Sequence, residues 1–144
     1  MKISGKMKER GILMIVDMSL EVLGSDTDQN GHMNHVRYIS YLEQARHTWY
    51  NGIGMPVRTL IEQEQIGTAV VHLETDFKKE ARAGDQLVIR TTLTRVGTKS
   101  FTLHQVILNE ETILVEATIV SVMFDLKARK AIPVHDKIKE AQFK

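Results

Sequence analysis

Between residues 16 and 22, apolar and polar side chains alternate one by one along the chain. A period of two residues is typical of a β-strand with one face on a core and the other in water. The stretch that follows, residues 24–34, is rich in Gly, Asp, Asn, Ser and Thr, which favour loops. The pattern therefore predicts a first strand and then a long polar loop.

A helical period begins after this loop and indicates a helix over residues 35–50. Its apolar positions, which share one face at this spacing, are Tyr38, Tyr41, Leu42, Ala45 and Trp49. Asn34 is a suitable N-cap, and the Asn-Gly pair at residues 51–52 is a stop signal. Glu43 and Arg46 lie away from the main stripe, so we expect a surface or interface ion pair, or a brace for the helix.

The rest of the chain has mainly strand-like patterns. Residues 57–65 are expected to form a short helix, and residues 135–143, after Pro133, a last short helical segment. Between them, four segments are rich in β-branched residues: residues 69–77, 86–96, 101–108 and 112–124. The short turns that separate these segments predict an antiparallel meander.

These elements indicate an α+β fold in which an antiparallel five-stranded sheet wraps around a long central helix. A large apolar helix face and a sheet with one apolar face bury each other in this arrangement. A sheet of five strands leaves an edge that needs cover, and pairing with a second copy would provide it. We therefore expect a homodimer or homotetramer.

The composition fits one globular domain, which we assign to residues 12–144. The chain has 144 residues, of which 42% are hydrophobic and 26% are charged. Residues 1–11 carry several basic side chains and are expected to form a mobile tail. The apolar run at residues 12–16 is too short for a signal peptide or a membrane span, so a cytoplasmic protein is expected.

The charge balance and the absence of cysteine narrow the function classes. The 19 Lys and Arg residues nearly cancel the 18 Asp and Glu residues. Nothing therefore drives the whole molecule toward nucleic acid, and a small molecule or a second copy is the expected partner. Without cysteine, disulfides, thiolate metal sites and a Cys nucleophile are excluded.

The polar loop concentrates the side chains that could carry chemistry. Asp26, Asp28, His32 and His35 lie within ten residues, at the start of the predicted helix. Free N–H groups and the positive end of the helix dipole at that point can polarise a carbonyl group. A nearby carboxylate can act as a base or nucleophile, which favours a catalytic Asp28, and capping of the loop is the alternative. A metal site is a further alternative, but the spacing matches no strong metal signature.

Three motifs together resemble the signature of the 4-hydroxybenzoyl-CoA thioesterase family. They are Asp-Thr-Asp at residues 26–28, Gly-His-Met-Asn at residues 31–34 and Tyr-Leu-Glu-Gln-Ala-Arg at residues 41–46. The likeness extends over residues 16–133 and includes Arg-Ala-Gly-Asp at 82–85 and Gly-Thr-Lys-Ser at 97–100. The resemblance implies a hot-dog fold and hydrolysis of an acyl-CoA thioester to a free carboxylic acid and coenzyme A.

The resemblance also implies the roles of individual residues. Asp28 matches the catalytic aspartate as general base or nucleophile, and His35 stands where bacterial short-chain acyl-CoA thioesterases of the family have a histidine. The expected substrate-binding residues are Gly31, His32, Met33, Asn34, Tyr38, Lys99 and Ser100. Backbone N–H groups after Gly31 would hold the thioester oxygen, and Lys99 and Ser100 would meet the phosphates of coenzyme A. No metal and no cofactor is expected, because coenzyme A is part of the substrate.

Three rival functions remain open at this point. The first is hydrolysis of an acyl-carrier-protein thioester, which would require a basic rim near the site and strong salt dependence. The second is a non-catalytic hot-dog dimer that binds an acyl ligand or a protein. The third is a hydratase or dehydratase on the same fold.

Overall fold

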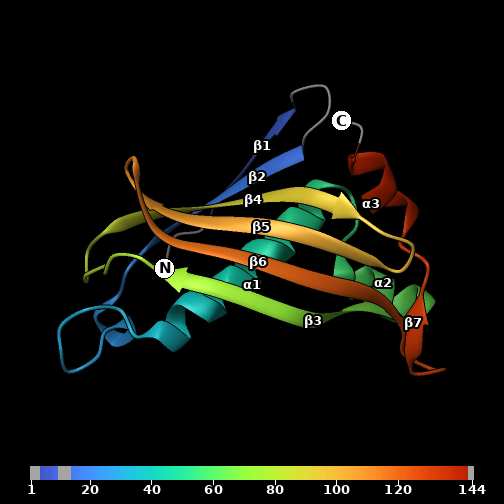
Figure 1. Ribbon diagram of the computed structural model, residues 1–144, viewed down its shortest axis with the longest axis horizontal. Coiled ribbons are helices and arrows are strands. Elements are labelled where there is room, and N and C mark those ends of the chain that lie inside the picture. Colours follow the sequence, from blue (N-terminus) through green and yellow to red (C-terminus); the bar gives the residue numbers. More distant parts are fainter. Residues whose placement is uncertain (1–3, 10–13, 143–144) are drawn as a thin grey trace.

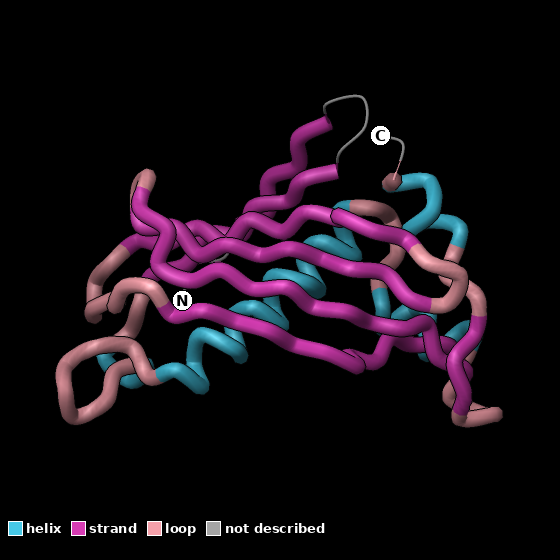
Figure 2. Tube along the Cα trace, viewed as in Figure 1, coloured by secondary structure: helices cyan, strands magenta, loops and turns pink. Residues whose placement is uncertain are grey.

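A computed structural model describes residues 4–9 and 14–142 of the chain. The helices and strands follow in this order: β1 (Ser4–Glu9), β2 (Met14–Glu21), the 3-10 helix η1 (Gly24–Asp26), α1 (His35–Gly52), α2 (Val57–Glu64), β3 (Ile66–Phe77), β4 (Gln86–Val96), β5 (Ser100–Asn109), β6 (Thr112–Asp125), β7 (Lys130–Ile132) and α3 (Asp136–Ala141). One curved sheet wraps around α1, which crosses its concave face, whereas α2 and α3 lie near one end (Figures 1 and 2). The predicted α+β architecture is confirmed.

The sheet is antiparallel throughout and has the strand order β1-β2-β4-β5-β6-β3, with β7 also paired to β6. The prediction of five strands is therefore wrong by two. One added strand is β7, and the other is β1, which pairs with β2 from Ser4↔Ser19 to Glu9↔Met14. Residues 4–9 thus form a strand where a mobile tail was expected, and the remainder of that tail lies outside the described residues.

The predicted meander holds only for β4, β5 and β6. The strand β3 pairs with β6, and β4 pairs with β2, so residues 78–85 connect strands that are not neighbours. Hydrogen bonds hold both ends of this connection. At its start, the N–H groups of Lys78 and Lys79 both donate to Leu114 O on β6, at 2.8 and 3.1 Å, and at its end the N–H of Gly84 donates to Val22 O, just after β2, at 2.9 Å.

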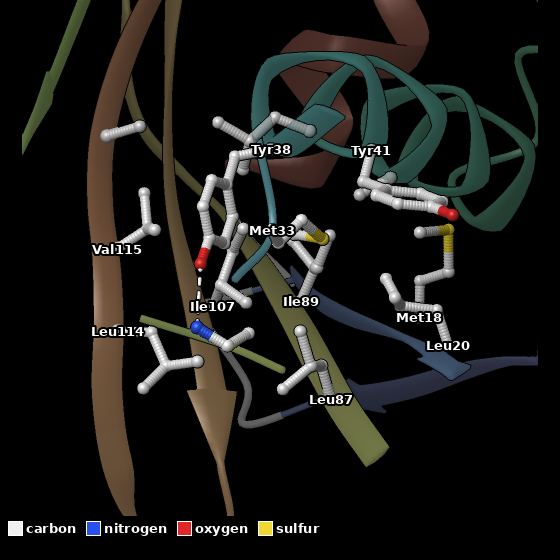
Figure 3. Close-up of a cluster of buried hydrophobic side chains, with 14 of the residues drawn as sticks. Met18, Leu20, Met33, Tyr38, Tyr41, Leu87, Ile89, Ile107, Leu114 and Val115 are labelled. Atoms are coloured by element: carbon white, nitrogen blue, oxygen red, sulfur yellow. Dashed lines mark hydrogen bonds between the residues drawn. The ribbon is translucent and has the colours of Figure 1, made fainter. Parts of the chain in front are cut away.

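The helix α1 starts and packs as predicted. The side chain of Asn34 accepts a hydrogen bond from the Val36 N–H at 2.9 Å, which caps the helix. All five residues of the predicted apolar stripe are buried. They divide between two core clusters, one of which contains Tyr38 and Tyr41 and packs against β2, β4, β5 and β6 (Figure 3).

A polar layer crosses the core beneath the middle of α1. Arg46 is only 6% exposed and donates to the Gln105 side-chain oxygen at 3.0 Å. The Gln105 amide in turn donates to Leu42 O and Thr91 Oγ1, both at 3.0 Å. Among the described residues there is no Glu43–Arg46 salt bridge, so the expected surface pair is wrong, and Arg46 braces the helix from inside.

No helix of the described part is long and apolar enough to cross a membrane.

Candidate active site

The polar loop between η1 and α1 is closed on itself by backbone hydrogen bonds. Thr27 and Met33 form an isolated antiparallel bridge, and the N–H of Asp28 donates to His32 O at 3.0 Å. At the tip of the loop, Gly31 has a φ of 84° and donates its N–H to Asp28 O at 3.1 Å. Gly adopts this left-handed conformation without the strain that a Cβ would introduce. The loop therefore holds Asp28 and His32 opposite each other.

Asp26 anchors the start of the loop to α1. Its side chain is 2% exposed and accepts hydrogen bonds from Leu23 N–H, Tyr41 Oη and Arg37 Nε at 2.9, 2.7 and 2.9 Å. Burial by itself would raise the pKa of Asp26, but these three donors and the Arg37 charge outweigh it. The pKa of Asp26 consequently lies below its ordinary value, and the group is a carboxylate at neutral pH.

A pocket of about 370 Å³ opens between this loop, the first turn of α1 and the chain that leaves β3. Its lining residues are Asp28, His32, Met33, His35, Tyr38, Phe77, Lys78, Lys79 and Glu80. Five of these residues were predicted to act at the site, and the pocket brings them together. The lining combines two carboxylates, two imidazoles and two lysines with an apolar wall, which suits a ligand that has polar groups on an apolar body.

Asp28 presents a partly unoccupied carboxylate to this pocket. One of its oxygens accepts from the Asn30 N–H at 2.8 Å. Among the described residues no hydrogen bond to its other oxygen is found. His35 is exposed, and its ring packs edge-on against Phe77 with the ring centres 6.3 Å apart. Asp28 is thus free to take up a proton or to attack, whereas His35 borders the pocket mouth.

Some backbone N–H groups near the pocket already donate hydrogen bonds within the protein, whereas others are available to a ligand. Within the described chain, the N–H groups of Met33 and Asn34 donate to Ala81 O and Asp26 O, at 2.8 and 2.9 Å. The N–H groups of His32 and His35 have no acceptor among the described residues. Among the described residues that line the pocket, these two amides and the N–H of Glu80 remain available to a carbonyl oxygen, so only part of the expected set after Gly31 is free.

Tyr38 joins the pocket to the core. Its side chain is buried and points from α1 toward the sheet, with the hydroxyl oxygen accepting from the Ala81 N–H at 2.9 Å (dashed line in Figure 3). Met33 enters the same cluster from the loop. Ala81 therefore connects the β3–β4 segment both to the loop and to α1.

Two of the predicted binding residues lie at the other end of the sheet. Ser100 pairs with Val122, which pairs with Ala69, whereas the pocket lies at the Phe77 end of β3. At about 3.3 Å per residue along a strand, roughly 26 Å separates these positions. Lys99, beside Ser100, is therefore also absent from the pocket of its own chain. Gly31 and Asn34 shape the loop and cap α1 but do not line the pocket.

Four lining residues were not anticipated, namely Phe77, Lys78, Lys79 and Glu80. They follow the predicted third strand, and the signal for them was the change from strand pattern to charged residues at this point. Glu80 lies 3.9 Å from the His32 ring nitrogen. Its neighbour Arg82 donates to it at 2.8 Å and keeps the pKa of Glu80 below its ordinary value. No group of three or more His, Asp or Glu side chains arranged for a metal ion occurs among the described residues.

Comparison with known proteins shows the family of the chain. A family model described as the thioesterase-like superfamily matches residues 22–142. The chain belongs to this superfamily. Acyl-CoA thioesterase YbgC of Haemophilus influenzae is 26% identical to this chain over 122 residues, which cover 85% of this chain and 90% of the relative. Long-chain acyl-CoA thioesterase FadM of Escherichia coli is 29% identical over 123 residues, which cover 84% and 92% of the two chains.

The solved structures confirm the expected hot-dog fold for this thioesterase-like chain. A 4-hydroxybenzoyl CoA thioesterase mutant complexed with 4-hydroxybenzoyl CoA superposes with a TM-score of 0.82 and 21% sequence identity. The match covers 89% of this chain and 98% of that one. The resemblance identified from the motifs is thereby confirmed, and the superfamily match spans the loop, α1 and the β3–β4 segment that form the pocket.

Proposed function

We propose that this protein is an acyl-CoA thioesterase, which hydrolyses an acyl-CoA thioester to a free carboxylic acid and coenzyme A. The observation that carries the proposal is the Asp28 carboxylate in a pocket at the N-terminus of α1, with one oxygen that accepts no hydrogen bond from the described residues. The printed activities of the relatives YbgC and FadM support the same reaction. We also propose that the enzyme works in the cytoplasm, as expected from the sequence.

The reaction uses the groups that converge on the pocket. The thioester oxygen accepts hydrogen bonds from the free N–H groups of His32 and His35, where the α1 dipole also favours negative charge. Asp28 either takes a proton from the attacking water or attacks the carbonyl carbon itself. In the second route the C–S bond breaks, coenzyme A leaves as a thiolate, and water then opens the acyl-aspartyl anhydride. Neither route requires a cofactor, since the thiolate is a good leaving group.

Lysine side chains near the pocket suit the phosphates of coenzyme A. Lys78 and Lys79 both line the pocket. Lys78 forms an ion pair with Glu116 at 2.9 Å, which raises the pKa of Lys78. Within the described residues Lys79 has no ion pair, so its charge is available to a phosphate. We therefore assign Lys79, rather than Lys99, to the coenzyme A of its own protomer.

A homodimer would bring Lys99 and Ser100 to the site of the other copy. The strand β3 is an edge strand, and Val70, Val71 and Phe77 on it are exposed. Apolar side chains on an unpaired edge favour pairing with a second strand. Antiparallel pairing of two β3 strands places the Phe77 end of one copy beside the Ile66 end of the other. The 97–100 hairpin, which lies at that end, would then approach Asp28 of the second copy.

Release of free thiol from a panel of acyl-CoAs tests the proposed reaction. The panel includes short, long and aromatic acyl groups, and each substrate is paired with the same acyl group on an acyl carrier protein. We expect steady hydrolysis of acyl-CoA. The substrate with the highest kcat/KM identifies the preferred class of acyl group. If only carrier-protein thioesters are hydrolysed, at a rate that depends strongly on salt, the protein is an acyl-carrier-protein thioesterase. If acyl ligands bind and none is hydrolysed, it is a binding protein.

A single turnover in ¹⁸O-water detects a nucleophilic Asp28 when water opens the anhydride at the aspartyl carbonyl. If Asp28 is a general base, every product acid carries one ¹⁸O from the attacking water. If Asp28 is the nucleophile and water opens the anhydride at the aspartyl carbonyl, the label appears in the enzyme and the first product acid is unlabelled. Mass spectrometry of the peptide that contains Asp28 reads the second outcome directly.

A further inference from the structure

We propose that Asp26, Arg37 and Tyr41 act as a positioning triad that holds the Asp28 loop in its reactive geometry. The proposal rests on the role assigned to Asp28 in the proposed function. None of the three triad residues lines the pocket, so none is placed to touch the substrate. Their effect on the reaction passes through the loop.

The contacts of Asp26 tie three separate parts of the chain together. Through its side chain it binds Leu23, before η1, and both Arg37 and Tyr41 on α1. Its backbone carbonyl accepts the N–H of Asn34 at 2.9 Å, at the other end of the loop. One residue thus fixes the entry of the loop, its exit and the first two turns of the helix.

The part of the loop between these anchors has little other support. Residues 29–31 at its tip are exposed, and the recorded hydrogen bonds of Asp28 are all made within the loop. The main hydrogen bond from the loop to the segment between β3 and β4 is donated by the Met33 N–H to Ala81 O. If Asp26 is released, the loop can therefore pivot about Met33, and the Asp28 carboxylate shifts relative to the free amides of His32 and His35.

The chemistry of the triad suits a rigid anchor. Asp26 is buried, and its charge is balanced by Arg37, which is 41% exposed and so retains part of its hydration. The Tyr41 hydroxyl donates to the carboxylate oxygen that Arg37 leaves free, and the guanidinium lies 5.2 Å from the Tyr41 ring centre. Each member therefore contacts the other two, and a fully satisfied buried network of this kind favours one geometry.

The test compares three triad variants with a matched ion pair elsewhere in the sheet. Tyr41→Phe removes one hydrogen bond, Arg37→Lys keeps the charge but loses the Nε geometry, and Asp26→Asn removes the anchor charge. The control is Asp17→Asn, which removes the charge from the pair that Asp17 on β2 forms with Arg90 on β4 through two bonds of 2.9 and 3.0 Å, and leaves one side-chain oxygen as an acceptor. All variants are assayed with the best acyl-CoA, and Asp28→Asn is assayed beside them.

We expect kcat to fall while KM stays near the wild-type value, because the triad positions Asp28 and does not bind substrate. A displacement of about 1 Å can reduce a rate about 100-fold, so we expect a loss of about 10- to 100-fold for Asp26→Asn and smaller losses for the two milder variants. Amide hydrogen exchange should accelerate in peptides that cover residues 24–34 and stay unchanged in the β4–β5 hairpin. Asp17→Asn should lose some thermal stability but keep its kcat.

The outcomes separate this inference from the proposed function. Wild-type kcat in all folded triad variants, with Asp28→Asn inactive, overturns the triad and leaves the proposed function standing. A loss of kcat that Asp17→Asn shares, or faster exchange throughout the chain, also overturns it, since the effect is then general destabilisation. Full activity of Asp28→Asn contradicts the proposed function itself. If Asp26→Asn fails to fold, Tyr41→Phe and Arg37→Lys carry the same test.

Discussion

Gln105 is the central hydrogen-bonding group of the buried polar layer, and its replacement tests what the layer contributes to stability. Gln105 is fully buried and contacts the Arg46 guanidinium, Leu42 O and Thr91 Oγ1. Gln105→Met keeps the length of the side chain and removes all three hydrogen bonds. The guanidinium of Arg46 then has no described partner, although it is only 6% exposed.

The expected loss of folding free energy follows from the three hydrogen bonds of Gln105. A hydrogen bond to a charged group contributes about 1.5–3 kcal/mol, and each neutral one about 1 kcal/mol. Gln105→Met should therefore lower the free energy of unfolding by about 3–5 kcal/mol. Burial already lowers the pKa of Arg46, so this site solvates a charge poorly even while the Gln105 oxygen accepts from the guanidinium.

Urea unfolding at fixed protein concentration measures the loss. Gln86→Met is the matched control, because Gln86 is exposed and its one side-chain bond joins Glu21 at the surface. We expect a change within about 0.5 kcal/mol for this control. The double variant Gln105→Met with Arg46→Met should recover part of the loss, since both polar partners are then removed together. A loss below about 1 kcal/mol for Gln105→Met would refute the reasoning.

Three further predictions concern the site. Tyr38→Phe leaves the Ala81 N–H without its acceptor, and urea unfolding should show a loss of about 1–3 kcal/mol. In Gly31→Ala the backbone is strained at a φ of 84°, but the added Cβ meets no atom within 4 Å. The free energy of unfolding should therefore fall by about 1–2 kcal/mol, and by less for Gly31→Asn. The depressed pKa of Asp26 stabilises the fold above about pH 4, the unfolded value, and this contribution disappears as the pH falls through the lower folded pKa. Urea titrations should therefore show a weaker acid dependence for Asp26→Asn, and equal slopes for both proteins would contradict the assignment.

Local patterns predicted the elements that depend on local spacing. The long helix was placed correctly because its apolar stripe and the Asn34 cap are both readable within a few residues. The same holds for the alternating strands β4, β5 and β6. The strand β1 was missed because residues 4–9 show no clear alternation, and only their pairing with β2 makes them a strand.

The features of the site that the sequence alone could not place depend on long-range pairing. Residues 26–38 formed a recognisable cluster because the loop and the helix start are adjacent in the chain. Residues 77–80 join them only because the segment after β3 crosses the sheet end toward β4. The register of β5 on β6 places Lys99 and Ser100 far from the pocket, and the spacing of a motif contains no information on that register.

The most direct test of the central claim is the turnover of Asp28→Asn on the best acyl-CoA. Glu80→Gln is the matched control, since Glu80 is a second carboxylate that lines the same pocket. Our account predicts that Asp28→Asn, still folded, loses kcat by a factor of about 100 or more, the usual scale of a lost base or nucleophile, while Glu80→Gln stays within a few-fold of wild type. Full activity of Asp28→Asn, or an equal loss in both variants, would contradict the assignment of Asp28 as the reacting group.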